Sequence, residues 1–339
     1  MSKGNSLVQD VLPVVEGLAA DFASQARGIE ELSASPRAHL ERLAECGYYR
    51  FVVEASPGQR RRALDLLSSG CGVTAFLSTQ HEGVCRRLHQ AGHPSAESAI
   101  KGEQWFGVCF AHLRRTPSPV SAIPGRNQVV FTGCGPWFSG FGLMTGLLVG
   151  GATESGRLLM GVTSMEEPEI VPRAMDSLVV MEATATVALD FNALAVPKED
   201  IVVEITPEDF LEKDMHSTVF QAARSLGAAR AASRFLEDGL RDAVSEKLEE
   251  QHLKMDAWDE KPDWEGSTRL RYEALRLTDM VVGAAYSAVG GKAHLLSHPL
   301  QRVAREAHFY STTQLTKPLR NKVLDNLRQS LSSEEFLGK

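Results

Sequence analysis

The chain has 339 residues, of which 43% are hydrophobic and 23% are charged, a composition typical of a globular protein with two or three domains. Its formal net charge of −7 argues against a nucleic-acid partner, because binding a phosphate backbone needs a basic surface. The longest apolar stretch, residues 141–151, is too short for a membrane helix, which needs about 20 apolar residues.

The amino terminus and the cysteines indicate a cytoplasmic protein. Residues 1–5 are polar and lack the apolar core of a signal peptide. The five cysteines are scattered and form no CxxC pair, so we expect free thiols in a reducing compartment. His81, His89, His93 and His112 show no spacing typical of metal ligands, so we expect no metal site.

Residues 1–103 show helical periodicity and are predicted to form an amino-terminal helical domain. Apolar side chains recur at spacings of three and four along its first helix, at Leu7, Val11, Val15, Leu18 and Phe22. Further helices are predicted over residues 36–46, 61–68 and 74–89, with glycines at positions 47 and 92 as stop signals.

Residues 104–206 have a different pattern, in which short apolar runs alternate with Gly, Pro and Ser. The runs are residues 105–110, 128–131, 147–150, 158–162, 178–180 and 187–191. Short strands with frequent turn signals predict an antiparallel β-barrel or sandwich as the middle domain. The proline-rich stretch between the first two runs is predicted to be a loop.

Residues 207–339 return to helical periodicity and are predicted to form a carboxy-terminal helical bundle. Helices are predicted over residues 220–243, 268–289, 301–311 and 318–330, and Gly227 would let the first of them approach a neighbour closely. The charged segment 246–266, which contains Pro262, is predicted to be an irregular link. The predicted fold class is therefore α+β, with a β domain between two helical domains.

A glycine-rich octet at residues 133–140 contains the first candidate site. Trp137, Phe138 and Ser139 follow one another at a predicted strand end. An indole can cover the face of a flat redox heterocycle while a hydroxyl or backbone N–H bonds its edge. A tryptophan that anchors a barrel corner explains the same residues, so both interpretations stay open.

Several segments in chain order resemble the acyl-CoA dehydrogenase superfamily. Residues 181–191 and 196–201 are similar to the strand and exit turn that close that family's β domain. Gly290 and Gly291, followed by Pro299, Arg302 and Arg305, are similar to its "GG … P-x-x-R-x-x-R-D-A" region. The order of helical, β and helical segments also agrees, so the resemblance covers most of the chain.

The resemblance implies an FAD held between the β domain and the carboxy-terminal bundle of a homodimer or homotetramer, acting on a small molecule such as an acyl-CoA. By position, Trp137, Phe138 and Ser139 would contact the isoalloxazine ring. Gly290 and Gly291 would let backbone amides approach the phosphates or the adenine end. A helix C-cap is the alternative explanation of these two glycines.

The family's catalytic base has no clear counterpart. Its usual carboxylate position falls on Gln314, which cannot accept a proton at neutral pH. The alternative position at the start of the long helix falls on Ser217, beside His216. His216 has the intrinsic pKa of a base, although a histidine at a helix start is commonly a surface or capping residue.

Three functions stay open on these residues. The first is a flavin-dependent oxidoreductase that oxidises an acyl thioester or a related small molecule with an unconventional base. The second is a reduced-flavin-dependent monooxygenase on the same fold, which does not need the carboxylate. The third is a catalytically inactive relative that acts as a binding or assembly protein. The family's "R-x-x-F-G" turn has no counterpart in residues 245–266, which favours the third.

Overall fold

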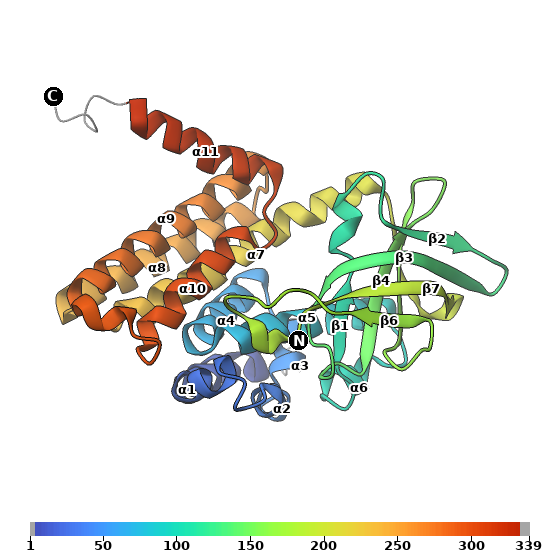
Figure 1. The fold of residues 1–339 in the computed structure, drawn as a ribbon, viewed down its shortest axis with the longest axis horizontal. Coiled ribbons are helices and arrows are strands. Elements are labelled where there is room, and N and C mark those ends of the chain that lie inside the picture. The colour runs from blue at the N-terminus through green and yellow to red at the C-terminus, as the bar shows by residue number, and fades with distance from the viewer. Residues whose placement is uncertain (1–3, 333–339) are drawn as a thin grey trace. The chain divides into compact units, whose positions relative to one another are not determined.

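A computed structural model of the protein shows a run of helices, a sheet of eight strands and a second run of helices (Figure 1). This order confirms the predicted fold class. The structure describes residues 4–332, and only the backbone of residues 4–10. Residues 1–3 and the side chain of Leu7, whose burial was predicted, therefore lie outside the described part. None of the described helices is long and apolar enough to cross a membrane.

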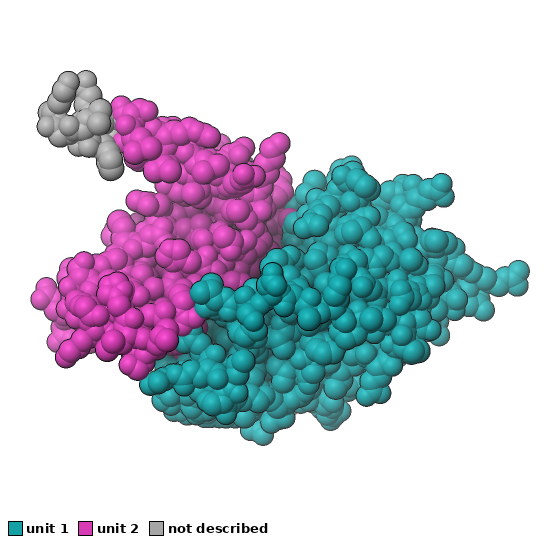
Figure 2. Space-filling view, viewed as in Figure 1, with its two compact units in different colours: residues 1–56, 71–212 teal, residues 57–70, 213–339 magenta. Residues whose placement is uncertain are grey.

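The chain divides into two compact units, which Figure 2 colours separately. Of the described residues, unit 1 comprises residues 4–56 and 71–212, and unit 2 comprises residues 57–70 and 213–332. The helix formed by residues 57–70 thus belongs with the carboxy-terminal helices. The division into domains at residues 1–103, 104–206 and 207–339 stays a prediction.

Three helices of unit 1 correspond to predicted ones, and two short helices, over residues 48–54 and 96–100, were not predicted. They are α1 (Gly4–Glu30), α2 (Arg37–Glu45), α3 (Tyr48–Glu54), α5 (Gly72–Ala91) and α6 (Ala96–Ile100). Val11, Val15 and Phe22 of α1 are buried as predicted, and Leu18 is half-buried. Gly47 and Gly92 adopt left-handed φ angles of 79° and 63° at the ends of α2 and α5, a conformation that glycine adopts at low cost.

The strands of unit 1 form one mixed sheet. They are β1 (Phe106–Cys109), β2 (Val120–Pro124), β3 (Gln128–Phe138), β4 (Gly146–Ala152), β5 (Leu158–Ser164), β6 (Ile170–Arg173), β7 (Val187–Pro197) and β8 (Ile201–Ile205). Their order is β6-β7-β3-β2-β4-β5-β8, and β1 pairs with β4. The pairings of β4 with β1 and with β2 are parallel, and the other pairings are antiparallel.

Two local predictions for this region were wrong. The proline-rich stretch contains β2, since Ala122 and Ile123 pair with β3. Residues 178–180 form no strand. The Leu178 N–H there donates to the Glu182 carboxylate at 2.6 Å, so this backbone amide bonds a side chain in place of a neighbouring strand.

The helices of unit 2 have other bounds than predicted, and the helix predicted over residues 220–243 is interrupted, because one helix ends at Ser233 and the next begins at Asp238. They are α4 (Pro57–Gly70), α7 (Pro207–Ser233), whose first six residues belong to unit 1, α8 (Asp238–Asp259), α9 (Trp264–Val289), α10 (Pro299–Thr312) and α11 (Lys317–Ser332). The predicted irregular link at residues 246–266 was wrong, because most of it is helix α8. Its charges pair along the helix, with Glu250 lying 2.6 Å from Lys247 and 2.9 Å from Lys254, and such pairs stabilise an exposed helix.

Helices α4 and α7 touch at Gly227. A Cβ atom added there would lie 2.4 Å from the Asp65 carbonyl oxygen and 2.5 Å from the Ser68 Cβ. Both distances are far below van der Waals contact, so only glycine fits without movement of α4. The predicted role of Gly227 in a close helix approach is confirmed, and α4 is the neighbour.

A buried carboxylate joins the same helices. Asp65 of α4 accepts two hydrogen bonds from Arg230 of α7, at 2.9 and 2.7 Å, and lies 2.9 Å from the His252 Nε2 of α8. Burial raises the pKa of Asp65, but the hydrogen bonds from Arg230 and His252 outweigh burial and hold this pKa below its usual value. Asp65 is therefore a charged link among three helices of unit 2.

We expect Gly227→Ala to destabilise unit 2 by about 1–3 kcal/mol, because the methyl group overpacks the contact with α4. The matched control is Gly283→Ala on α9, where an added Cβ meets nothing within 4 Å. That change is expected to leave stability unchanged or to raise it by up to about 1 kcal/mol through helix propensity. Denaturant unfolding measures both, and equal effects of the two variants would contradict the close contact.

We expect Asp65→Asn to lower the free energy of unfolding by about 3 kcal/mol near pH 7, because Arg230 loses its buried partner. The folded-state pKa of Asp65 is depressed, so its contribution is complete above the unfolded pKa of about 4 and is lost as the pH falls further. The difference between wild type and variant should therefore be constant from pH 8 to about 5 and shrink below about 4. Asp325→Asn, at an exposed pair with Arg328, is the control and should change little. A difference that persists unchanged into acid would contradict the charged link.

Candidate functional site

Trp137 of unit 1 is exposed and has an unusual backbone conformation. Its side chain is 53% exposed, and its φ of 64° lies in the left-handed region that side chains other than glycine rarely adopt. It lies in a register shift of the β3–β7 pairing between Gly135 and Phe138, which marks a β-bulge or a similar irregularity. Such irregularities often present a side chain at a functional site.

Ser139, two residues after Trp137, is the first of three side-chain hydroxyl groups that bond in series. The Ser139 hydroxyl is 2.8 Å from the Thr186 hydroxyl, which is 2.8 Å from the Thr184 hydroxyl. The Gly140 N–H donates to the Thr184 carbonyl at 2.7 Å. The end of β3 is therefore joined to residues 182–186, and Ser139 is held in place by side chains that the sequence analysis did not single out.

Phe138 differs from its two neighbours. Its side chain is fully buried, and a Cβ added at Gly107 would come within 2.5 Å of its ring. The ring is therefore part of the core of unit 1. Any contact of Phe138 with a cofactor would have to come from its backbone.

Trp137 and the hydroxyl groups joined to the end of β3 are of the residue types that contact a flavin, and of these the indole is exposed, whereas Ser139 and Thr184 are 4% and 1% exposed. Isoalloxazine is flat and apolar on its faces and has hydrogen-bonding atoms at its edge. An exposed indole can cover a face, and hydroxyl and backbone N–H groups can bond an edge. Val179 and Phe141, which are 80% and 39% exposed, are further exposed apolar side chains in the adjoining segments.

Gly290 and Gly291 of unit 2 follow the end of α9. Gly290 has a φ of 71°, and its N–H donates to the Tyr286 carbonyl, so it is a helix C-cap. Both glycines are exposed, and an added Cβ would meet nothing within 4 Å at either. The backbone of this turn is open to approach, and its contact with a cofactor stays a prediction.

The arginines of the resemblance motif bond within unit 2. Arg302 is buried and pairs with Glu306 at 2.5 Å, one turn further along α10. It also donates to the Gly70 carbonyl of α4 at 3.4 Å. Arg305 donates to Gln301 at 2.9 Å. The motif thus attaches α10 to α4.

Gln314 and Ser217 are hydrogen-bonded to each other in unit 2. Ser217 is on α7 and Gln314 is in the turn after α10, and the Ser217 hydroxyl donates to the Gln314 Oε1 at 3.0 Å. The two positions to which the resemblance assigned a base are therefore one place in the fold. Neither side chain can accept a proton at neutral pH, so this pair of residues supplies no general base.

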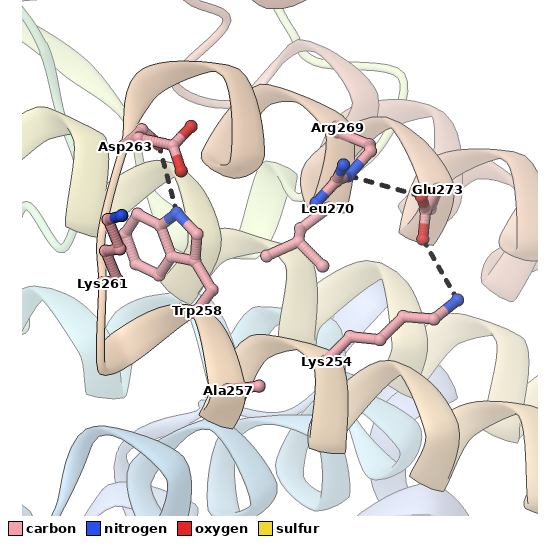
Figure 3. Close-up of a pocket in the computed structure, with 8 residues that line it drawn as sticks. All are labelled: Lys254, Ala257, Trp258, Lys261, Asp263, Arg269, Leu270 and Glu273. Atoms are coloured by element: carbon pink, nitrogen blue, oxygen red, sulfur yellow. Dashed lines mark hydrogen bonds and ion pairs between the residues drawn. The ribbon is translucent and has the colours of Figure 1, made fainter.

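His216 makes a different contact. It is exposed, and its ring centroid lies 5.2 Å from that of Trp258. Trp258 lines a pocket of about 480 Å³ together with Leu270, Lys254, Lys261, Arg269 and Glu273, among others (Figure 3). Glu273 lies 3.4 Å from Lys254 and 3.9 Å from Arg269, so much of the charge in this pocket is paired internally.

Residues 4–332 contain no group of three or more His, Cys, Asp or Glu side chains that could hold a metal ion. Two of the four histidines that the sequence analysis considered as metal ligands contact backbone carbonyls. His81 lies 2.9 Å from the Ala99 carbonyl, and His112 lies 2.8 Å from the Gly150 carbonyl. Burial lowers the pKa of His81 to about 4, which keeps its imidazole neutral in the core.

Comparison with known proteins gives similarity in fold alone. No protein-family model and no curated protein sequence matches the chain. Among solved structures, KijD3 in complex with FMN and a dTDP-linked amino-keto sugar has a TM-score of 0.73 at 17% identity, with 94% of each chain covered. Butyryl-CoA dehydrogenase from Megasphaera elsdenii has a TM-score of 0.72 at 14% identity, covering 94% of this chain and 98% of that one. Glutaryl-CoA dehydrogenase from Mycobacterium smegmatis in complex with FADH2 has a TM-score of 0.76 at 12% identity, covering 93% and 94%.

Proposed function

We propose that this chain, which has the fold of the acyl-CoA dehydrogenase superfamily, is a flavin-dependent oxidoreductase. The observation that supports this most directly is Trp137, an exposed indole in a left-handed backbone conformation beside a bonded set of hydroxyls. A conformation that costs energy at a non-glycine residue is kept where the surrounding structure enforces it, and such positions cluster at ligand sites.

The residues of the chain would position the cofactor and shield it. Trp137 would cover one face of the isoalloxazine ring, and Ser139, held by Thr186, would bond its edge. A bound flavin supplies the redox chemistry itself. FAD is our proposal for the flavin, and FMN, which occurs in the KijD3 complex, is the alternative.

The pair formed by Ser217 and Gln314 bears on the type of reaction. Oxidation of an acyl thioester needs a base to remove the α-proton, and neither residue is one. A reduced-flavin-dependent monooxygenase does not need a carboxylate at this place. The neutral pair therefore favours the monooxygenase over the dehydrogenase, in which another group would have to act as base.

The substrate class follows from the ligands of proteins with a similar fold. One solved structure is a glutaryl-CoA complex, with 15% identity and a TM-score of 0.76, and the KijD3 ligand is a 4-keto sugar. Both ligands contain a carbonyl group. We therefore infer a small carbonyl-containing substrate for this chain, with an acyl thioester and a nucleotide-linked keto sugar as the two candidates.

Titration of the purified protein with FAD, and separately with FMN, tests the flavin proposal through flavin fluorescence. We expect saturable binding by the wild type and a loss of about tenfold in affinity for Trp137→Ala, because base-like rings gain about 1–3 kcal/mol from an aromatic side chain. Trp264→Ala, at the exposed first residue of α9, is the control and should bind as the wild type does. Equal affinity for the two variants would contradict the placement of the flavin at Trp137.

The colour of the purified protein, its bleaching by butyryl-CoA and its consumption of oxygen separate the three functions. A yellow protein that butyryl-CoA bleaches without oxygen would support the dehydrogenase. A yellow protein that butyryl-CoA leaves unchanged, and that consumes oxygen once its flavin is reduced, would support the monooxygenase. A colourless protein that neither flavin reconstitutes would support the inactive binding or assembly protein.

A further inference from the structure

The Gln314 side chain is oriented by the hydrogen bond from Ser217. Because Ser217 donates to Oε1, the opposite end of the amide carries the two N–H donors. These donors have no hydrogen-bond partner within residues 4–332, and Gln314 is only half-buried. Position 314, where the resemblance expects a catalytic base, therefore offers hydrogen-bond donors.

The backbone at Gln314 is held in an unfavourable conformation. Its φ of 51° lies in the left-handed region, which is unfavourable for a residue with a Cβ. The preceding turn is bonded on both sides, since the Thr313 N–H donates to the Phe309 carbonyl at 3.1 Å and the Leu315 N–H donates to the Thr312 carbonyl at 3.3 Å. The turn thus fixes the direction in which the Gln314 side chain leaves the chain.

A buried arginine joins the two segments that carry this pair. Arg271 of α9 donates to the Gln221 carbonyl of α7 through Nη1 and to the Tyr310 carbonyl of α10 through Nη2, the latter at 2.5 Å. Gln221 lies one helical turn after Ser217, and Tyr310 lies four residues before Gln314. A single guanidinium therefore sets the spacing between the backbone that carries the serine and the backbone that carries the glutamine.

The surroundings of Arg271 indicate that it positions the backbones of α7 and α10 and does not serve as one member of an ion pair. It is 1% exposed, and its partners within the described residues are two carbonyls and the Ser225 hydroxyl. Burial, together with the nearby Arg224, lowers the pKa of Arg271 to about 9. A buried cation without a carboxylate is costly, so its two fixed carbonyl bonds are the evident compensation.

We propose that the Gln314 amide is a hydrogen-bond donor to the carbonyl oxygen of the substrate, that Ser217 selects the amide orientation, and that Arg271 is a positioning residue for both. This proposal rests on the proposed function for the carbonyl-containing substrate class. It assigns Gln314 a binding role at the position where the resemblance expects a base.

Calorimetric binding of matched ligands tests the proposal. One pair is butyryl-CoA and the thioether S-butyl-CoA, and the other is a dTDP-linked 4-keto sugar and its 4-hydroxy counterpart. In the class that binds, we expect the wild type to prefer the carbonyl ligand by about fivefold to tenfold, the effect of one hydrogen bond. In Gln314→Met the preference should fall to about one, with the affinity for the ligand that lacks the carbonyl unchanged.

Two further variants separate positioning from general stability. Ser217→Ala should keep the fold and lose most of the preference, because the amide can then rotate. Arg271→Met should lose the preference, and Arg271→Lys, which can still bond one carbonyl, should restore part of it at comparable thermal stability. The control is Gln301→Met, which removes a glutamine side chain of α10 that accepts a hydrogen bond from Arg305 and should keep the full preference.

The outcomes distinguish this proposal from the flavin proposal. A carbonyl preference that survives Gln314→Met overturns the donor role even if the protein binds flavin. A preference that Gln314→Met abolishes supports the donor role even if the protein binds no flavin. If neither pair of ligands binds, the carbonyl substrate class is wrong and the donor role fails with it.

Discussion

Helix α7 is held by two arginines, and its position among the helices of unit 2 depends on their hydrogen bonds. Arg230, on α7 itself, delivers its guanidinium to the buried Asp65 of α4. Arg271, on α9, bonds the Gln221 carbonyl of α7 from another direction. Helices can slide when only apolar side chains join them, but a guanidinium that bonds named oxygen atoms fixes the axial position. The Gly227 contact then fixes the separation of α7 from α4.

Unit 1 obtains its fixed geometry in a different way. The corner formed by Trp137, Ser139 and the two threonines depends on backbone conformation and on neutral hydroxyl groups, with no charge among them. Met181 and Ala185 also have positive φ angles, of 64° and 46°; Met181 precedes the threonines that hold Ser139, and Ala185 lies between them. Several strained residues in one short region imply that the surrounding strands enforce the conformation. The corner is therefore rigid without being charged, which suits a flat and largely apolar ligand ring.

The sequence predicted several elements that depend on local patterns, missed the local pattern of one helix, and could not show the bonds between distant residues. The apolar face of α1 and the glycine stops at positions 47 and 92 are local signals, and the structure has both. Helix α8 was mistaken for a link because its residues are charged, and only the pairs at spacings of three and four, such as Glu250 with Lys254, show why it is a helix. The bonds of Ser139 to Thr186 and of Ser217 to Gln314 join residues 47 and 97 positions apart, and no pattern of one sequence brings such positions together.

Gln314 occupies the position where the family resemblance expects a carboxylate, and the contacts of Gln314 bear on what this replacement means. Replacing one ionisable residue in a site normally leaves a buried partner unsatisfied, and a second neutral residue that completes the hydrogen bond removes this cost. Here the hydroxyl of Ser217 meets the amide oxygen of Gln314, and the strained turn and Arg271 keep the pair aligned. This alignment supports the proposed role of Gln314 as a hydrogen-bond donor, a role in which no proton is removed.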